Sequence, residues 1–229
     1  MNVFVTGGTG YLGARLIGAL LDRGHRVRGL ARPHSAQRLP PGCGLAEGDA
    51  LDADSYAGLV PPSDTLVHLV GPPRPTPARA RQFREVDLAS AREAVRAAAR
   101  AGVRHVVYVS VAQPAPVMQA YVAARAEAEA AILASGIRAT VLRPWYVLGP
   151  GHRWPYLLLP AYALAGMLPS TRDTAHRLGL VTVRQMTRAL VDAVEQPPEH
   201  GVRVVEVPEI RAAVLPPLRR RAPAAPALA

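Results

Sequence analysis

A glycine-rich turn, TGGTGYLG at residues 6–13, joins a short apolar strand to an amphipathic helix at the start of this chain. Its glycines match two related spacings, G-x-G-x-x-G and T-G-x-x-G-x-x-G, through Gly7, Gly8, Gly10 and Gly13. Glycine permits a turn with positive φ and lets the backbone approach a pyrophosphate, and the N-terminus of the next helix offers N–H groups to phosphates. A strand, turn and helix in this order predict a dinucleotide-binding βαβ unit, the alternative being an ordinary tight turn.

Apolar strands and amphipathic helices then alternate along most of the 229 residues. We expect strands at residues 3–5, 25–30, 45–47, 65–70, 104–110, 139–142, 180–183 and 202–207, and helices at residues 11–23, 54–60, 79–101, 121–135 and 186–194. Because strands that alternate with helices pair in parallel, this pattern predicts an α/β fold with a Rossmann-type doubly wound parallel sheet.

The composition changes after Pro144, where the chain becomes aromatic and proline-rich. We expect one Rossmann domain over residues 1–215, with a small C-terminal substrate lobe built mainly from residues 145–180. Aromatic side chains of this region either line an apolar substrate cleft or pack as a lobe core or subunit contact: Trp145, Tyr146, Trp154, Tyr156 and Tyr162. The tail at residues 216–229 is rich in proline, alanine and arginine, and is expected to be disordered.

The net charge of +10 suggests anionic partners, but all 27 basic residues are arginine and they are scattered along the chain. No helix-turn-helix, zinc-finger or RNA-binding aromatic motif accompanies them, so we expect no specific nucleic-acid partner. The single cysteine, Cys43, excludes an internal disulfide, and the seven histidines show no metal-ligand spacing.

The longest apolar run, residues 154–169, is too short and too interrupted by proline to span a membrane. The first apolar stretch is the glycine turn with its helix, so we expect no signal peptide and a cytoplasmic location. The long helices at residues 79–101 and 121–135 are candidate surfaces for a homodimer.

The end of the second strand bears on which dinucleotide binds. An acidic residue there would accept a hydrogen bond from the ribose 2′-hydroxyl, but the chain has Ala31-Arg32, and arginine pairs with a phosphate. The sequence thus favours NADP(H), with NAD remaining possible, unless Arg32 is simply one more surface arginine. Asp49, followed by Ala50, is placed to meet the adenine amino group or to cap a helix, and Gly71 lets the backbone approach the adenosine ribose.

Five segments occur in a shared order: the glycine turn, HLVG at residues 68–71, YVS at 108–110, Y-x-x-x-R at 121–125 and RP at 143–144. In this set the chain resembles the short-chain dehydrogenase/reductase superfamily. Its length and glycine spacing are similar to the atypical branch, with the NmrA-like proteins and truncated NAD-dependent epimerases and dehydratases. The resemblance implies that Arg143 and Pro144 contact the nicotinamide carboxamide. The expected cofactor-binding set is Gly7, Gly10, Tyr11, Leu12, Gly13, Arg32, Asp49, Ala50, Gly71, Arg143 and Pro144.

Enzymes of this superfamily use a Ser–Tyr–Lys set, and the resemblance implies that Ser110, Tyr121 and Arg125 take these places. The tyrosine would exchange a proton with the substrate oxygen, the cation would favour its phenolate form, and the serine would orient the substrate. Tyr121 and Arg125 are four residues apart and share a helix face. Arg125 departs from lysine: it keeps the charge, but it cannot release a proton to a relay.

These features predict an NAD(P)(H)-dependent oxidoreductase acting on a small carbonyl or alcohol, without a metal. Two other functions stay open: a sugar-type epimerase or dehydratase, and a non-catalytic NADP(H)-binding sensor or accessory protein of the NmrA-like kind. The choice between an enzyme and a sensor depends on Arg125. Activity is retained if the positive charge is sufficient, and it is lost if catalysis needs a residue that can relay a proton. Glu127 and Glu129 face different directions on one predicted helix, and neither is expected to form half of an acid/base pair.

Overall fold

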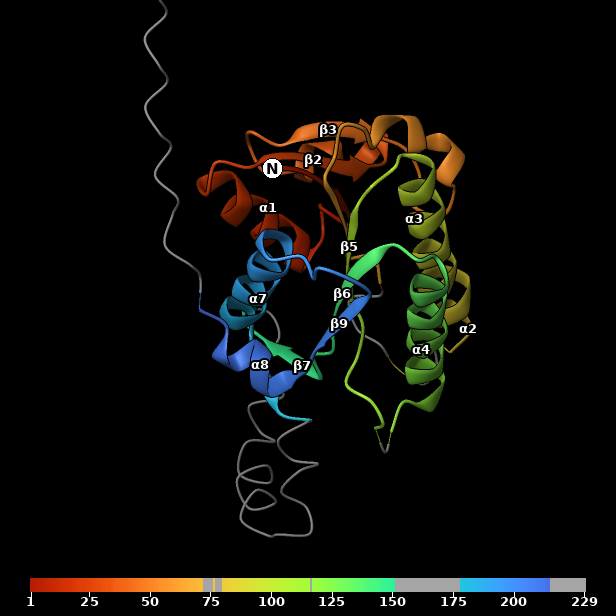
Figure 1. Ribbon diagram of the computed structural model, residues 1–229, viewed down its shortest axis with the longest axis vertical. Helices are drawn as coiled ribbons and strands as arrows, with labels where there is room; N and C mark the ends of the chain where they lie inside the picture. Colours follow the sequence, from red (N-terminus) through yellow and green to blue (C-terminus); the bar gives the residue numbers. More distant parts are fainter. Residues whose placement is uncertain (72–75, 77–79, 116, 151–177, 215–229) are drawn as a thin grey trace, which may run out of the picture.

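The computed structural model describes residues 1–71, 76, 80–115, 117–150 and 178–214. Seven strands of this part form the central sheet: β1 (Asn2–Thr6), β2 (Arg26–Ala31), β3 (Gly44–Glu47), β4 (Thr65–His68), β5 (His105–Val109), β6 (Arg138–Leu142) and β9 (Val202–Val205). Their order is β3-β2-β1-β4-β5-β6-β9, and every neighbouring pair is parallel (Figure 1). The predicted Rossmann-type doubly wound sheet is confirmed, with its order reversing between β1 and β4.

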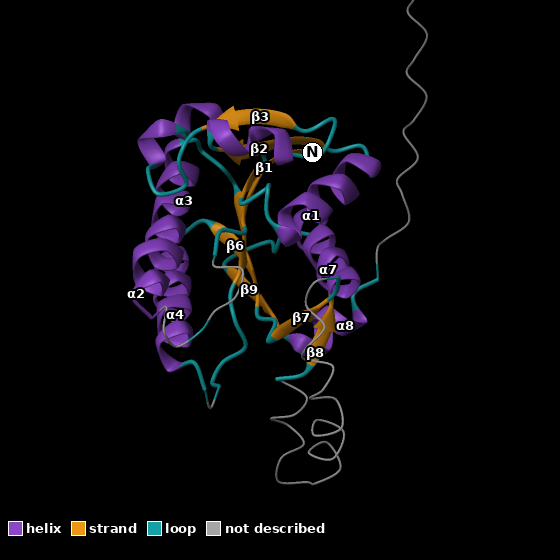
Figure 2. Ribbon diagram, turned by 180° about the vertical axis from the view of Figure 1, so that it is seen from behind, coloured by secondary structure: helices purple, strands orange, loops and turns teal. Residues whose placement is uncertain are grey.

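Helices cover both faces of this sheet, as Figures 1 and 2 show. One layer holds α1 (Tyr11–Asp22), α7 (Val183–Glu195) and α8 (Val207–Ala212). The other holds α2 (Ala80–Gln82), the π-helical segment η5 (Phe83–Leu88), α3 (Ala89–Arg100) and α4 (Gln119–Ala134). Segments α2, η5 and α3 follow one another directly, so the long helix expected at residues 79–101 is present from Ala80 with a π-helical turn inside it.

Successive residues of the central strands pack against opposite helical layers. Val5 of β1 and Val67 of β4 are buried with α1 and α7, whereas Phe4 and Leu66 are buried with α3. Because both faces are covered, these strands read as continuous apolar runs rather than alternating ones. Each such side chain contributes about 1.5–3 kcal/mol on burial, so the strands are firm supports for the loops at their C-terminal ends.

The helix expected at residues 54–60 is replaced by two 3₁₀ turns, η2 (Ala53–Ser55) and η3 (Ala57–Leu59). The run is short, contains Gly58 and meets two prolines at residues 61–62, so a regular helix has no room to extend. A third 3₁₀ segment, η1 (Pro33–Arg38), follows β2. The fourth strand ends at His68, two residues before the expected end.

The strand expected at residues 180–183 does not join the central sheet. Instead β8 (Leu180–Thr182) pairs in parallel with β7 (Tyr146–Leu148) in a separate two-stranded sheet. Neither β7 nor α8 was predicted, because three and six residues are too few to show a hydrophobic period.

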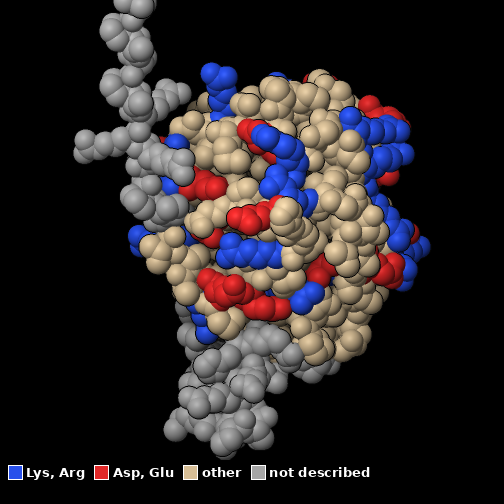
Figure 3. Space-filling view, viewed as in Figure 1, with Lys and Arg blue, Asp and Glu red and all other residues tan. Residues whose placement is uncertain are grey.

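Much of the expected substrate lobe falls at residues 151–177 and the expected disordered tail at residues 216–229, both outside the described residues. Three of the lobe aromatics lie there: Trp154, Tyr156 and Tyr162. None of the helices in the described ranges is both long enough and apolar enough to cross a bilayer. On the face seen in Figure 3, basic and acidic side chains lie interspersed rather than in separate patches.

Candidate functional site

The glycine turn packs so tightly that two of its glycines admit no side chain. Gly7 has a φ of +75°, and a Cβ there would lie 2.7 Å from the carbonyl carbon of Leu69 after β4. A Cβ at Gly13 would collide with the carbonyl oxygen of Gly7. The spacing read from the sequence thus has a steric cause: it seats the start of α1 directly on the turn.

The N-terminus of α1 is open to an anion. Gly10 is the N-cap residue, makes no side-chain cap, and no acidic residue occupies the first turn. The first turn of the helix, which includes Leu12 and Gly13, therefore offers its positive dipole end to an anion without a competing carboxylate. These residues fit the pyrophosphate of a dinucleotide, which needs a close backbone and N–H donors.

Tyr11 also joins the glycine turn to the second, smaller sheet. Its phenol lies against Gly149, just after β7, where a Cβ would collide with the phenol oxygen. The guanidinium of Arg15 lies 4.2 Å from the centre of the Tyr11 ring and donates to the Tyr11 carbonyl. The side chain of Tyr11 therefore packs within the protein, and its predicted cofactor contact stays a prediction.

The residues predicted to select the dinucleotide lie after β2 and β3. Arg32 is exposed at the start of η1, whose last turn carries Arg38. Asp49 is exposed and accepts a hydrogen bond from the N–H of Leu51 at 3.0 Å, within a turn. The alternative that Asp49 caps a helix is wrong, because the N-cap residue of η2 is Asp52. Ala50 packs on the apolar layer beneath. Arg32 and Arg38 are thus both exposed cations at this edge of the sheet.

Tyr121 and Arg125 come together on α4 as predicted. The helix begins at Gln119, so Tyr121 lies in its first turn, and the guanidinium carbon of Arg125 is 5.1 Å from the centre of the Tyr121 ring. At this distance the cation is attracted by the face of the ring. Tyr121 is half-buried, and Arg125 is buried.

Arg125 makes further contacts that the sequence did not reveal. It donates to the carbonyl of Val109 at 2.8 Å and to the phenol oxygen of Tyr108 at 3.1 Å, and it forms an ion pair with Asp87 of η5. Burial alone would lower the pKa of Arg125, but Tyr121, Tyr108 and Asp87 raise it, so the guanidinium stays charged.

Burial also shifts the pKa values of the ionisable residues around Arg125. It raises the pKa of Asp87 to about 6 and of Tyr108 to about 12, although Arg125 acts in the opposite direction on both. Burial and the charge of Arg125 together lower the pKa of His68 to about 3, so His68 is neutral. Its nitrogens meet the hydroxyls of Thr6 and Ser90 at 2.7 and 3.3 Å.

Gly71 has a steric role in this cluster. A Cβ there would collide with the guanidinium of Arg125 and lie 3.1 Å from a carboxylate oxygen of Asp87. The absence of a side chain at the end of β4 is thus needed for the Arg125–Asp87 pair to approach. Its predicted approach to the adenosine ribose stays a prediction.

Ser110 is not brought to Tyr121 by any hydrogen bond among the described residues. Its hydroxyl donates to Glu129 of α4, which also accepts from Gln113 at 2.8 Å. Arg143 forms an ion pair with the same Glu129 carboxylate and a second one with Glu206 at 3.1 Å. Two predicted site residues, Ser110 and Arg143, therefore meet through a third residue that was not predicted.

The backbone next to Arg143 is also engaged. The N–H of Arg143 donates to Val205 of β9 at 2.9 Å, and the carbonyl of Pro144 accepts from Ala112 at 2.9 Å. These bonds fix the segment after β6 in place. Its predicted contact with the nicotinamide carboxamide is neither supported nor opposed by them.

Three residues of the site were not predicted as site residues: Asp87, Tyr108 and Glu129, of which Glu129 was set aside as an acid/base partner. Glu129 follows Tyr121 and Arg125 at a further four-residue step, a stripe that could have been found by helical spacing. Its neighbour Glu127 faces outward and pairs with Arg84 at 2.8 Å, so the expectation that the two carboxylates face different directions is confirmed. Within the described ranges, no group of His, Cys, Asp and Glu side chains could hold a metal ion.

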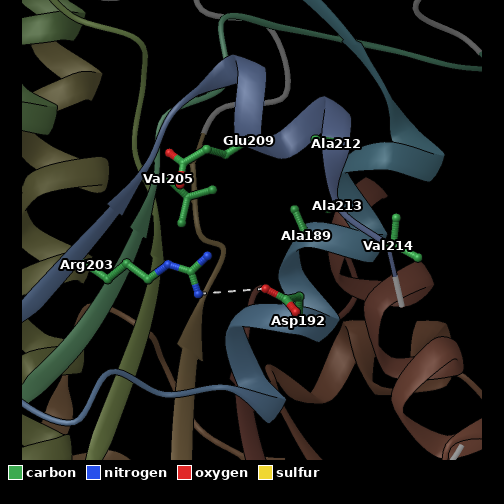
Figure 4. A pocket seen from close by; sticks show the side chains of 8 residues that line it. All are labelled: Ala189, Asp192, Arg203, Val205, Glu209, Ala212, Ala213 and Val214. Atoms are coloured by element: carbon green, nitrogen blue, oxygen red, sulfur yellow. Dashed lines mark ion pairs between the residues drawn. The ribbon is translucent and has the colours of Figure 1, made fainter. Parts of the chain in front are cut away.

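A groove of about 260 Å³ lies between β9, α7 and α8 (Figure 4). An apolar floor with three charged side chains lines it: Ala189, Asp192, Arg203, Val205, Glu209, Ala212, Ala213 and Val214. Arg203 and Asp192 face each other across it at 3.8 Å. None of the predicted site residues contributes to this groove.

Comparison with known proteins adds to this geometry. The model of a family described as NAD(P)H-binding matches residues 7–156. A 3 beta-hydroxysteroid dehydrogenase/Delta 5-->4-isomerase of Mycobacterium tuberculosis is 37% identical over 115 residues, which cover 48% of this chain and 31% of that protein. A 3-diazoavenalumate denitrifying reductase of a Streptomyces species is 31% identical over 225 residues, 85% of this chain and 72% of that protein. The chain thus matches less than a third of the mycobacterial relative's length.

Among solved structures, the enzyme WbmH of Bordetella bronchiseptica, in complex with NAD+, superimposes with a TM-score of 0.64. The two sequences are 22% identical, and the match covers 88% of this chain and 74% of that one. At this identity the likeness concerns the fold, which agrees with the parallel sheet described above.

Proposed function

The chain belongs to the NAD(P)H-binding family, within the short-chain dehydrogenase/reductase superfamily, and on this premise we propose that it is an NADP(H)-dependent oxidoreductase acting on a small carbonyl or alcohol. The observation that carries the proposal is the 5.1 Å approach of Arg125 to the ring of Tyr121. Tyr121 lies in the first turn of α4, the helix after β5, and the glycine turn follows β1, so both lie at the C-terminal edge of the sheet, where such folds bind their ligands.

The chain's own residues would hold the dinucleotide at two places. The open N-terminus of α1 suits its pyrophosphate, and the exposed guanidinium of Arg32 suits a 2′-phosphate, for which we propose NADP(H) over NAD(H). When bound, the nicotinamide supplies or accepts a hydride. Asp49 follows β3 and Gly71 follows β4, the two strands that flank β2 and β1, and their predicted cofactor contacts belong to this proposal.

Tyr121 would exchange the proton. Its phenol gives a proton to the substrate oxygen as a carbonyl becomes an alcohol, or takes one in the reverse direction. Arg125 favours the phenolate by its charge and cannot carry the proton further, so the proton must return to solvent by another route. With its hydrogen donated to Glu129, Ser110 can only accept, so in this arrangement it would orient the hydroxyl of an alcohol substrate. To hold a carbonyl oxygen, the Ser110 hydroxyl would have to turn from Glu129 and donate to the substrate.

One observation favours a second function, that of a non-catalytic NADP(H) sensor. The charge of Arg125 is already paired with Asp87, which is fully buried. A paired cation favours a phenolate less than a lone one, so the nucleotide could bind without turnover.

Turnover of prebound NADPH with a panel of small ketones and quinones separates the two functions. An oxidoreductase consumes NADPH with some member of the panel, and Tyr121→Phe lowers the rate by about 10²–10⁴-fold while leaving NADPH affinity nearly unchanged. Tyr56→Phe is the matched control, since the Tyr56 hydroxyl is buried without a hydrogen-bond partner among the described residues. Equal rates in both variants would remove Tyr121 from the mechanism.

Two wider expectations remain proposals. We propose a cytoplasmic protein that binds a small-molecule substrate, and a homodimer that uses the outer faces of α3 and α4. Leu133 of α4 is 66% exposed, a large apolar side chain suited to such a contact. Light scattering of the full chain and of Leu133→Glu would test the dimer, which should dissociate in the variant.

A further inference from the structure

Two helical segments meet at Tyr121 and Arg125 with matched spacing. Phe83 and Asp87 are four residues apart on η5, and Tyr121 and Arg125 are four apart on α4. The rings of Phe83 and Tyr121 lie 5.0 Å apart, and Asp87 forms the ion pair with Arg125. One segment therefore contacts both members of the proposed catalytic pair, aromatic against aromatic and acid against base.

The pair of charges is closed off from water. Asp87 has no exposed surface and Arg125 is 5% exposed. The second oxygen of the Asp87 carboxylate, Oδ2, and the Nε of Arg125 are buried without hydrogen-bond partners in the described part of the chain. In such surroundings charges interact strongly, so Asp87 cancels a large part of the field that Arg125 exerts on Tyr121.

Other ionisable groups around this pair do not take over the role of Asp87. Tyr108 of β5 contacts Arg125 through its neutral hydroxyl, and His68 of β4 stacks on Tyr108 with ring centres 5.9 Å apart. Glu129, one turn along α4, is bound to Arg143. Among the described residues, Asp87 is the carboxylate paired with Arg125.

We propose that Asp87 is a positioning residue for the Tyr121–Arg125 pair, holding the guanidinium against the tyrosine and cancelling much of its charge there. This inference rests on the proposed function of Tyr121 as the acid/base. Arg125 keeps its proton, so its own charge is constant. Its effect on Tyr121 can still vary, because the charge of Asp87 offsets it. Burial raises the pKa of Asp87 to about 6, which agrees with a carboxylate whose charge is costly at this place.

The ionisation of Tyr121 itself tests the inference, without substrate or nucleotide. In the full chain carrying ¹³Cζ-tyrosine, an NMR titration follows each phenol, and Tyr121→Phe assigns the signal. Asp87→Asn keeps the shape and removes the charge, so we expect the midpoint of Tyr121 to fall by about one pH unit, a tenfold change in its ionisation constant. Glu85→Gln is the matched control, because Glu85 lies on the same segment but pairs with Arg81 at the surface, and it should leave the midpoint in place.

A double variant keeps the inference testable if Asp87→Asn does not fold with an unpaired buried cation. Asp87→Asn with Arg125→Gln removes both charges and leaves two neutral amides. If Asp87 cancels most of the Arg125 charge, the Tyr121 midpoint in the double variant stays near that of the wild type. A midpoint raised by about a unit or more in the double variant, or unmoved in Asp87→Asn, would overturn the inference.

A fluorescence titration with NADPH on the same samples separates this inference from the proposed function. Failure of the wild type to bind NADPH counts against the proposed function alone, since the tyrosine titration needs no nucleotide. Binding with an unmoved Tyr121 midpoint in Asp87→Asn counts against the role of Asp87 alone.

Discussion

The glycine turn and the α4 stripe form opposite ends of the candidate site and differ in how their polar groups are used. At the turn, the first N–H groups of α1 have no capping side chain, and two glycines are required by shape. Along α4, Arg125 is paired with Asp87, and Glu129 is bound to both Ser110 and Arg143. The backbone geometry of the glycine turn suits a ligand, whereas the charged side chains of α4 are already paired with neighbouring side chains.

This difference bears on the two parts of the proposed function, dinucleotide binding and proton exchange. Binding of a pyrophosphate uses a close backbone and a helix N-terminus without a competing carboxylate, and both are present at the turn. Proton exchange needs a cation whose charge reaches the tyrosine, and that charge is shared with Asp87. The rate of turnover should thus respond to the charges around α4, and nucleotide affinity to the shape of the turn.

The largest expected effect comes from a methyl group placed in the turn. Gly13→Ala forces a Cβ against the carbonyl of Gly7, at a cost of about 1–3 kcal/mol, and should weaken NADPH binding by about 100-fold. Gly18→Ala on the same helix meets no atom within 4 Å and should stabilise the fold by about 0.5–1 kcal/mol. Urea unfolding and NADPH fluorescence measure both; similar behaviour of the two variants would contradict a shape-determined turn.

A smaller effect is expected from the one cation proposed to meet the nucleotide. Arg32→Ser removes a charge-assisted contact worth about 1.5–3 kcal/mol, so the ratio of NADPH to NADH affinity should fall by at least about tenfold. Arg26→Ser is the control, because Arg26 is exposed at the beginning of β2, the strand that Arg32 follows. It should not change the ratio. An unchanged ratio in Arg32→Ser would identify Arg32 as an ordinary surface arginine.

The histidines buried in the sheet should make stability depend on pH. Burial lowers the pKa of His68 to about 3 and of His105 to about 4, both below the unfolded value of about 6.5. Their stabilisation is full above the unfolded pKa and is lost as pH falls toward the folded values, by about 2 kcal/mol for each histidine between about pH 7 and pH 5. Asp87, whose pKa is raised, loses stabilisation as pH rises through about 6 and offsets part of this change.

Urea midpoints across this range measure the dependence. His105→Gln should flatten it, because the glutamine cannot gain a proton beside Thr65 and Thr140. His34→Gln, at an exposed position of η1, should follow the wild type. A steeper fall in His105→Gln than in the wild type would show that other groups dominate.

The smallest effect is expected where charges are paired at the surface. Asp54 pairs with Arg96 and Arg100, and all three side chains are exposed. Solvent and salt screen such pairs, so Asp54→Asn should leave both the urea midpoint and NADPH affinity within the scatter of replicates. A clear loss in either quantity would mean that surface pairs matter as much as the buried pair at α4.

The sequence predicted the fold because its signals are local and repeated. The strands β1, β4 and β5 are mostly apolar runs, and α1 follows its glycine turn immediately. The short elements were not predicted correctly. Residues 54–60 form 3₁₀ turns rather than a helix, and β7 and α8 have too few residues to show a hydrophobic period.

The candidate site was predicted in part for the same reason. Tyr121 and Arg125 share a helix, so their four-residue spacing was enough to bring them together. Asp87 reaches Arg125 across 38 positions of sequence, and Ser110 turns to Glu129 because a carboxylate happens to face it from α4. Pairings between distant elements depend on tertiary packing and leave no periodic signal.

The most direct test of the account is a titration of the full chain with NADPH and with NADH, following nicotinamide fluorescence. We expect saturable binding of both nucleotides, with NADPH the tighter of the two because of Arg32. Absence of binding by either nucleotide would contradict the assignment of the glycine turn, and with it the proposed oxidoreductase.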